Sequence, residues 1–136
     1  MKYSIKKILW ATDFSPESAN ALTYAEYFAR KFDAKIIAVH VLPELDPGLF
    51  ESRPAMLEDI YEQAGIKLGQ ARKRLETLAS RKSLRFQKVI IDPGSPAKMI
   101  VEAAEKEKAD LIIMGKTGLS GLEKVFLGSV ANGVLR

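Results

Sequence analysis

Short apolar runs alternate with segments of helical periodicity along this chain. Four runs predict β-strands at residues 5–12, 34–42, 86–91 and 110–114. Apolar positions three or four residues apart predict helices at 16–32, 55–82 and 96–108, with a further helix beginning at 128. The second strand is apolar on both faces, as strands of a covered parallel sheet are. This alternation predicts an α/β protein with an open parallel sheet and helices on both faces.

The longest predicted helix carries one continuous apolar stripe. The stripe consists of Leu57, Tyr61, Ala64, Leu68, Ala71, Leu75 and Leu78. We expect it to pack against the sheet rather than against a coiled-coil partner. Gly65 and Gly69 lie inside this helix, where each costs about 1 kcal/mol, so a kink is compatible with the sequence there.

Composition narrows the class of protein. The 136 residues suit one domain, 1–136, and the chain has no linker or repeat. The absence of cysteine removes disulfides, thiolate metal sites and cysteine nucleophiles. No apolar stretch approaches the roughly 20 residues of a membrane span or the core of a signal peptide. We therefore expect a cytoplasmic protein with no membrane partner.

Charge adds little to this picture. The net charge of +4 comes from 21 basic and 17 acidic residues. The basic clusters at 6–7, 72–74 and 81–82 are short, and no aromatic residues interleave with them as base-stacking would require. We interpret them as solvated surface and expect no nucleic-acid partner.

The most informative loop follows the fourth strand. In open α/β sheets, ligands bind beyond the carboxyl ends of the strands. Here Gly115 and Gly118 are followed by Gly128 and Ser129, where the last helix begins. Glycines allow close approach of a ligand, and a helix start offers unpaired N–H groups to phosphate oxygens. A plain turn, with Ser129 only as a helix cap, is the alternative interpretation.

Three familiar glycine motifs do not fit this loop. A Walker A loop would need glycine where Asp110 stands, and no G-x-G-x-x-G dinucleotide motif is present. The G-x-x-G of an RNA-binding KH domain joins two helices, whereas this loop follows a strand.

The spacing Gly115, Gly118, Gly128-Ser129 matches the pattern G-x2-G-x9-G-S/T in full. With it, the chain resembles the ATP-binding members of the universal stress protein family over nearly its whole length. Residues 8–15, 39–41, 94–97 and 110–115 also resemble family segments. The resemblance implies a Rossmann-like sheet of five strands. The fifth strand is apparently missing from residues 1–136, so either it lies beyond Arg136 or this form lacks it. In the family that strand often makes a dimer contact, so a homodimer is expected.

The resemblance also implies roles for individual residues. Asp13 and the backbone of Val41 would contact the adenosine part, and Gly115 would lie against the ribose and phosphates. The phosphates would be held by Gly118, Gly128 and Ser129, with Mg²⁺ or Mn²⁺ alongside. Without the resemblance, Asp13 is equally well interpreted as a turn residue near the cap at Ser15.

The function implied is an ATP-binding switch in stress response, whose nucleotide occupancy is read by a protein partner. The alternatives are a dimeric protein that acts through protein contacts without nucleotide, and a slow ATP hydrolase. No convincing catalytic base supports efficient hydrolysis, because the single histidine, His40, lies at an apolar strand end and is interpreted as structural. Asp92 does not suggest a receiver-type phospho-acceptor, since only one acid, Asp13, follows the first strand.

Overall fold

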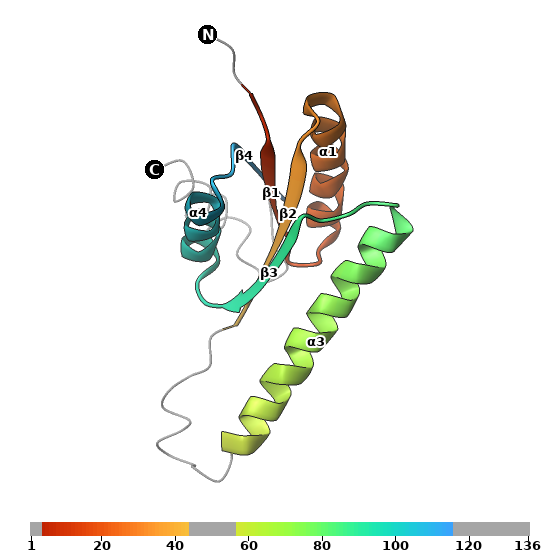
Figure 1. The fold of residues 1–136 in the computed structure, drawn as a ribbon. Coiled ribbons are helices and arrows are strands. Elements are labelled where there is room, and N and C mark those ends of the chain that lie inside the picture. Colours follow the sequence, from red (N-terminus) through yellow and green to blue (C-terminus); the bar gives the residue numbers. More distant parts are fainter. Residues whose placement is uncertain (1–3, 44–56, 116–136) are drawn as a thin grey trace.

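The computed structural model describes residues 4–43 and 57–115 (Figure 1). Three of the predicted site residues, Gly118, Gly128 and Ser129, lie outside these ranges. The elements in chain order are β1 (Lys7–Ala11), α1 (Pro16–Phe32), β2 (Lys35–Leu42), α3 (Leu57–Arg81), β3 (Lys88–Pro93), α4 (Pro96–Glu107) and β4 (Leu111–Met114). The predicted alternation of strands and helices is confirmed in this part of the chain.

The strands form a parallel sheet in the order β3-β2-β1-β4. From β1 the chain moves outward to β2 and β3, and it then returns to the other side of β1 for β4. Ala11 is in register with Val39 on one side and with Met114 on the other. The strand order therefore reverses between β1 and β4, which is where open α/β sheets bind their ligands.

The helices cover both faces of the sheet, as predicted. Helices α1 and α3 lie on one face and α4 lies on the other (Figure 1). Alternate residues of β1 point to opposite faces of the sheet and pack in two different layers. Ile8 and Trp10 pack in the α1/α3 layer, while Leu9 and Ala11 pack in the α4 layer.

Helix α1 begins as the sequence predicts. Ser15 is its N-cap, and the Ser15 hydroxyl accepts a hydrogen bond from the Ser18 N–H at 3.1 Å. Pro16 occupies the first helical position and Glu17 lies in the first turn. The helix buries Leu22 and Ala25 on the face turned to the sheet.

Helix α3 is continuous through Gly65 and Gly69, and its stripe is only partly covered. Ala71 and Leu75 are buried, but Tyr61 is 60% exposed. A helix of 25 residues is about 37 Å long, whereas the eight residues of β2 span about 26 Å. The helix therefore outruns the sheet, and the prediction of packing along the whole stripe is wrong for its N-terminal part.

The end of β3 also differs from the prediction. The strand runs from Lys88 to Pro93 rather than over residues 86–91. Asp92 and Pro93, which lie beyond the predicted strand, pair with Val41 and Leu42 of β2. The turn comes at Gly94, whose φ of 152° suits glycine. Pro93 is tolerated because it is the last residue of the strand.

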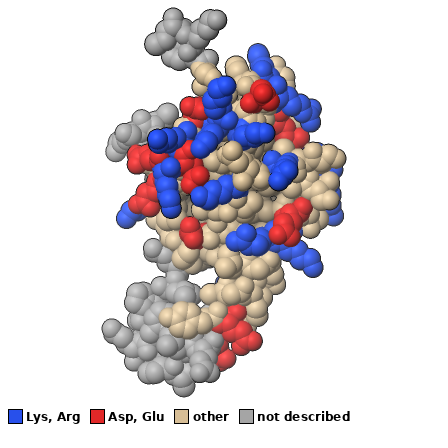
Figure 2. All heavy atoms as spheres, in the orientation of Figure 1, with Lys and Arg blue, Asp and Glu red and all other residues tan. Residues whose placement is uncertain are grey.

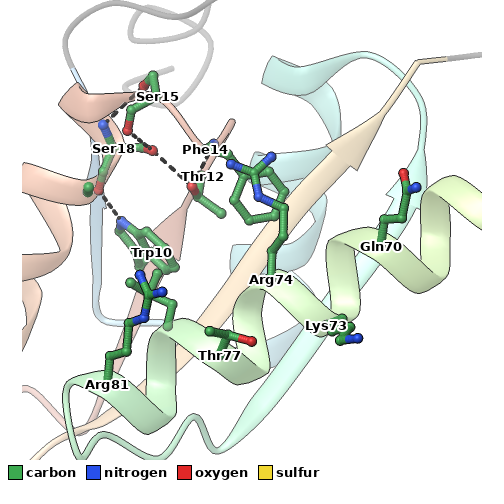
Figure 3. A pocket seen from close by; sticks show the side chains of 12 residues that line it. Trp10, Thr12, Phe14, Ser15, Ser18, Gln70, Lys73, Arg74, Thr77 and Arg81 are labelled. Atoms are coloured by element: carbon green, nitrogen blue, oxygen red, sulfur yellow. Dashed lines mark hydrogen bonds between the residues drawn. The ribbon is translucent and has the colours of Figure 1, made fainter.

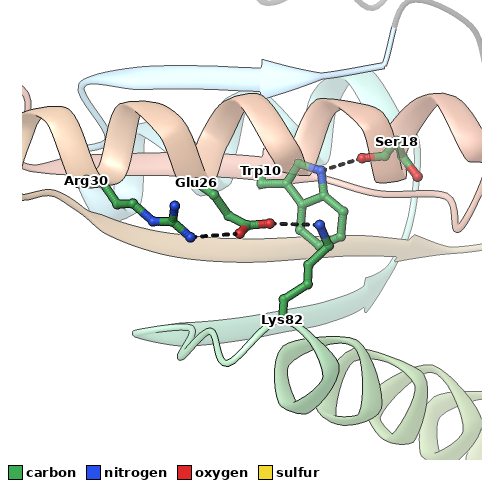
Figure 4. A network of polar contacts seen from close by, with 5 residues as sticks. All are labelled: Trp10, Ser18, Glu26, Arg30 and Lys82. Atoms are coloured by element: carbon green, nitrogen blue, oxygen red, sulfur yellow. Dashed lines mark hydrogen bonds and ion pairs between the residues drawn. The ribbon is translucent and has the colours of Figure 1, made fainter.

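Polar contacts join α1 to the chain at the end of α3 (Figure 4). Lys82 Nζ lies 2.9 Å from Glu26 Oε1, and the side chain of Glu26 is only 13% exposed. Arg30, on the next turn of α1, makes a longer contact of 3.6 Å with Glu26. Nearby, the Nε1–H of the buried Trp10 donates to the backbone oxygen of Ser18 at 2.9 Å. The Lys82–Glu26 ion pair thus joins the residue after α3 to α1, and the Trp10 hydrogen bond joins β1 to α1.

The surface mixes charges of both signs. In the view of Figure 2, lysine and arginine side chains are interspersed with aspartate and glutamate. Among the helices that the structure describes, none has the length and apolar composition needed to cross a membrane.

Candidate functional site

The sheet brings three of the predicted site residues to one edge. Asp13 follows β1, Val41 is the penultimate residue of β2, and Gly115 directly follows β4. The register sets Ala11 beside both Val39 and Met114, so the three residues come from adjacent carboxyl ends. Val41 and Met114 pack in the α4 layer, together with Ala11. The edge therefore lies at the reversal of strand order, next to the α4 face.

The turn after β1 is held by its own side chains. Phe14 adopts a left-handed conformation with φ of 64°. Its N–H donates to Thr12 Oγ1 at 2.9 Å, and the Ser15 N–H donates to Asp13 Oδ1 at 2.9 Å. Asp13 is thus a turn residue, as one interpretation of the sequence proposed. A carboxylate has two oxygens and several acceptor sites, so the turn role and a ligand role are compatible.

A chain of buried hydroxyls supports this turn. Ser18 Oγ donates its hydrogen to the backbone oxygen of Ser15 at 2.8 Å. In the 2.9 Å contact between Thr12 Oγ1 and Ser18 Oγ, Thr12 must therefore be the donor. Thr12, Ser15 and Ser18 are all buried. Ser18 was not predicted from the sequence, although a serine three residues after the cap is a signal of such a network.

His40 links β2 to the same turn. Its Nδ1 lies 2.8 Å from the backbone oxygen of Thr12, and its ring centroid lies 4.5 Å from that of Phe14. A carbonyl oxygen only accepts, so Nδ1 carries the proton. This geometry supports the structural interpretation of His40.

Gly115 packs closely against the start of α1. A Cβ at this position would lie 3.1 Å from the backbone carbon of Glu17 and from the Ser18 nitrogen. The end of β4 therefore touches the first turn of α1, 97 residues earlier in the chain. The sequence predicted Gly115 as a site of ligand approach, which stays a prediction, and the structure adds a contact between protein segments.

A metal site is not evident in this part of the protein. Within residues 4–43 and 57–115, no group of three or more His, Asp or Glu side chains is placed to hold a metal ion.

The chain matches the family model described as the universal stress protein family over residues 4–136. It is 37% identical over 136 residues to universal stress protein MJ0531 of Methanocaldococcus jannaschii, covering 96% of this chain and 76% of the relative. It is 30% identical to universal stress protein MJ0577 of the same organism, covering all of this chain and 91% of the relative.

Solved structures agree with these relatives. The structure of MJ0577 matches with a TM-score of 0.77 at 30% identity, over 98% of this chain and 90% of that one. A universal stress protein solved in complex with cAMP matches with a TM-score of 0.56 at 26% identity, over 98% of this chain and 90% of that one. Family model, relatives and structures converge, and the chain belongs to the universal stress protein family.

Proposed function

We propose that this protein binds ATP at the carboxyl edge of its sheet and acts as a nucleotide-dependent switch. The observation that carries the proposal is the convergence of Asp13, Val41 and Gly115 at the reversal of strand order. Asp13 follows β1, Val41 lies in β2 and Gly115 follows β4, so three separate segments of the chain meet at this edge. The cAMP complex of a relative supports an adenine nucleotide as the ligand class.

Each part of the edge offers suitable chemistry. The Asp13 carboxylate accepts hydrogen bonds from ribose hydroxyls, and the main chain of Val41 offers a donor and an acceptor to an adenine edge. Gly118, Gly128 and Ser129 would hold the phosphates with backbone N–H groups and a hydroxyl. Mg²⁺ or Mn²⁺ would be bound with the phosphates, which supply oxygen ligands.

The switch follows from differential binding. A ligand shifts a conformational equilibrium only by the difference between its affinities for the two states. If ATP binds one arrangement of the glycine loop, occupancy stabilises that arrangement, and a protein partner can recognise it. We further propose that the protein works as a homodimer in the cytoplasm.

Calorimetric titration with ATP and Mg²⁺ tests the proposal. Gly118→Val and Gly128→Val should each weaken binding at least about tenfold, because the added methyls occupy space where phosphate oxygens meet the backbone. Gly69→Val is the matched control, since nothing lies within 4 Å of a Cβ at Gly69 in the exposed part of α3. Folded glycine-loop variants that bind ATP as the parent does would refute the site.

A parallel titration with cAMP separates the two adenine nucleotides. ATP should bind more tightly, because cAMP has a single phosphate and leaves most loop contacts unmade. Tighter binding of cAMP, unaffected by Gly128→Val, would favour a cyclic-nucleotide sensor instead.

A further inference from the structure

A hollow lies between α1 and α3, away from the α4 layer (Figure 3). This α1/α3 groove has a volume of about 600 Å³. One wall comes from β1, the turn after it and the start of α1, and the other from one side of α3. Small-molecule sites commonly have volumes of about 300–1,000 Å³, so the groove is of a suitable size.

The first wall contains polar groups, but these groups already form hydrogen bonds within the protein. The Trp10 indole N–H is used by Ser18, and the hydroxyl of Thr12 is used in the contact with Ser18. Trp10 itself is fully buried, beneath the floor of the groove. What this wall offers to a ligand is apolar surface, chiefly the methyl of Ala19 and the edge of the Phe14 ring.

The second wall is cationic. Lys73, Arg74 and Arg81 line the groove from α3, and none of the groove's described lining residues is acidic. These three also make no ion pair with any acidic residue in the described ranges. In contrast, Arg30, Lys82 and Lys88 each have a carboxylate partner there. Three positive charges thus face one hollow without a described counter-charge.

Arg74 is held in place by an aromatic ring. Its guanidinium carbon lies 4.1 Å from the centroid of the Phe14 ring, and Figure 3 shows it above that ring. Stacking uses the face of the guanidinium and leaves its N–H donors in the plane available. Figure 3 also shows Arg81 extending toward Trp10 from two helical turns further along α3.

We propose that the α1/α3 groove binds a small phosphate monoester with an aromatic body. A phosphate monoester carries a charge of about −1.5 to −2 at pH 7, which suits several cations better than a monovalent carboxylate would. Arginine matches phosphate oxygens with paired N–H donors. The body of the ligand would lie against Phe14, Ala19 and Leu78.

The groove adjoins the proposed nucleotide edge, because Thr12, Phe14 and Ser15 of the turn that carries Asp13 line it, but the two sites lie on different faces of the sheet. Phe14 and Leu78 pack with the α1/α3 layer, whereas Val41 and Met114 pack with the α4 layer on the opposite face. Ligand binding in the groove therefore does not depend on ATP binding, and one proposal can be refuted while the other holds.

The test uses 1-naphthyl phosphate as the probe, titrated calorimetrically and by emission of Trp10, the single tryptophan. We expect binding by the probe and at least tenfold weaker binding by 1-naphthol, which lacks the anion, and by inorganic phosphate, which lacks the body. Arg74→Gln and Arg81→Gln should each weaken the probe about tenfold or more. Both side chains are exposed, so the variants should fold.

Arg72→Gln is the matched control, because Arg72 is on the same helix but lines a different hollow, beside β3 and α4. It should leave probe affinity within about twofold, as surface charges act weakly at a distance. Equal weakening by Arg72→Gln, or no binding by the parent, would overturn the proposal. Saturating ATP should not displace the probe, and competitive displacement would place the probe at the nucleotide edge instead.

Discussion

The Nδ1–H of His40 donates to the backbone oxygen of Thr12 across 2.8 Å, so β2 holds the residue that precedes Asp13. The same imidazole packs against Phe14 with a ring separation of 4.5 Å. Two contacts from one side chain therefore fix the turn that leads into α1. The single histidine of the chain serves the geometry of the edge.

His40→Ala should destabilise the protein by about 1–3 kcal/mol, because it leaves a part-buried carbonyl oxygen without its donor. Urea unfolding followed by circular dichroism measures the change. His40→Asn is the control, since its side-chain amide can donate near the position of Nδ1, and it should recover part of the loss. An alanine variant as stable as the parent would show that the hydrogen bond is dispensable.

The spacing of apolar residues predicted the interior of each helix and strand. It did not predict where the pairing of a strand or the packing of a helix ends. Strand β3 extends to Pro93 because β2 offers pairing partners as far as Leu42, and the partner lies about 50 residues away in sequence. Helix α3 has a regular stripe, yet Tyr61 is exposed because the sheet is shorter than the helix. The spacing of apolar residues shows which face of a helix is apolar. It does not show how long the sheet is that covers this face.

The candidate site was predictable to the same extent. The topology of parallel strands fixes which chain ends meet, so Asp13, Val41 and Gly115 could be assigned to one edge. The contact of Gly115 with α1 could not be foreseen, because no local pattern marks it. The basic cluster at 72–74 was interpreted as solvated, and its residues are exposed. Within it, Lys73 and Arg74 line the groove, whereas Arg72 lines a different hollow. Helical geometry separates residues that are adjacent in sequence.

Gly115→Ala should destabilise the protein by about 1–3 kcal/mol. Its Cβ would be 3.1 Å from backbone atoms of the first turn of α1, which cannot move without disturbing the Ser15 cap. Thermal and urea unfolding measure the effect. Gly65→Ala is the opposite control, because open space surrounds that position in α3. It should stabilise by up to about 1 kcal/mol. Equal effects of the two substitutions would contradict the close contact.

Asp110 should make stability depend on acid pH. Its Oδ2 accepts from the Lys6 N–H at 2.8 Å and the Lys7 N–H at 3.0 Å. The hydrogen bond from Lys6, followed by that from Lys7, lowers the pKa of this carboxyl below its ordinary value. A group with a lowered folded-state pKa stabilises the protein above its unfolded pKa, and this contribution is lost as pH falls below about 4.

Asp110→Asn should therefore flatten the loss of stability between about pH 5 and pH 2, measured as the urea midpoint at each pH. Asp92→Asn, an exposed acid at the carboxyl end of β3, serves as the control and should leave the Asp110 contribution in place. A parent-like pH profile for Asp110→Asn would mean that the two backbone hydrogen bonds do not depend on the charge.

Finally, bound ATP should be turned over slowly, if at all. Hydrolysis requires an in-line water, a group that orients it and neutralisation of charge on the transferred phosphoryl group. At the proposed site, backbone N–H groups and lysines of the glycine loop would bind phosphates in the ground state and the transition state alike, and uniform binding does not raise turnover. The Nδ1–H of His40 is hydrogen-bonded to the backbone oxygen of Thr12, and Asp13 Oδ1 accepts a hydrogen bond from the Ser15 N–H. Neither side chain is therefore an obvious group to orient a water molecule. Glu123, outside the described residues, is the only acid of the loop.

Single-turnover assays with labelled ATP should give rates well below about 1 s⁻¹, the lower end of typical enzymes. A faster rate that disappears in Glu123→Gln would make the protein an ATPase rather than a switch.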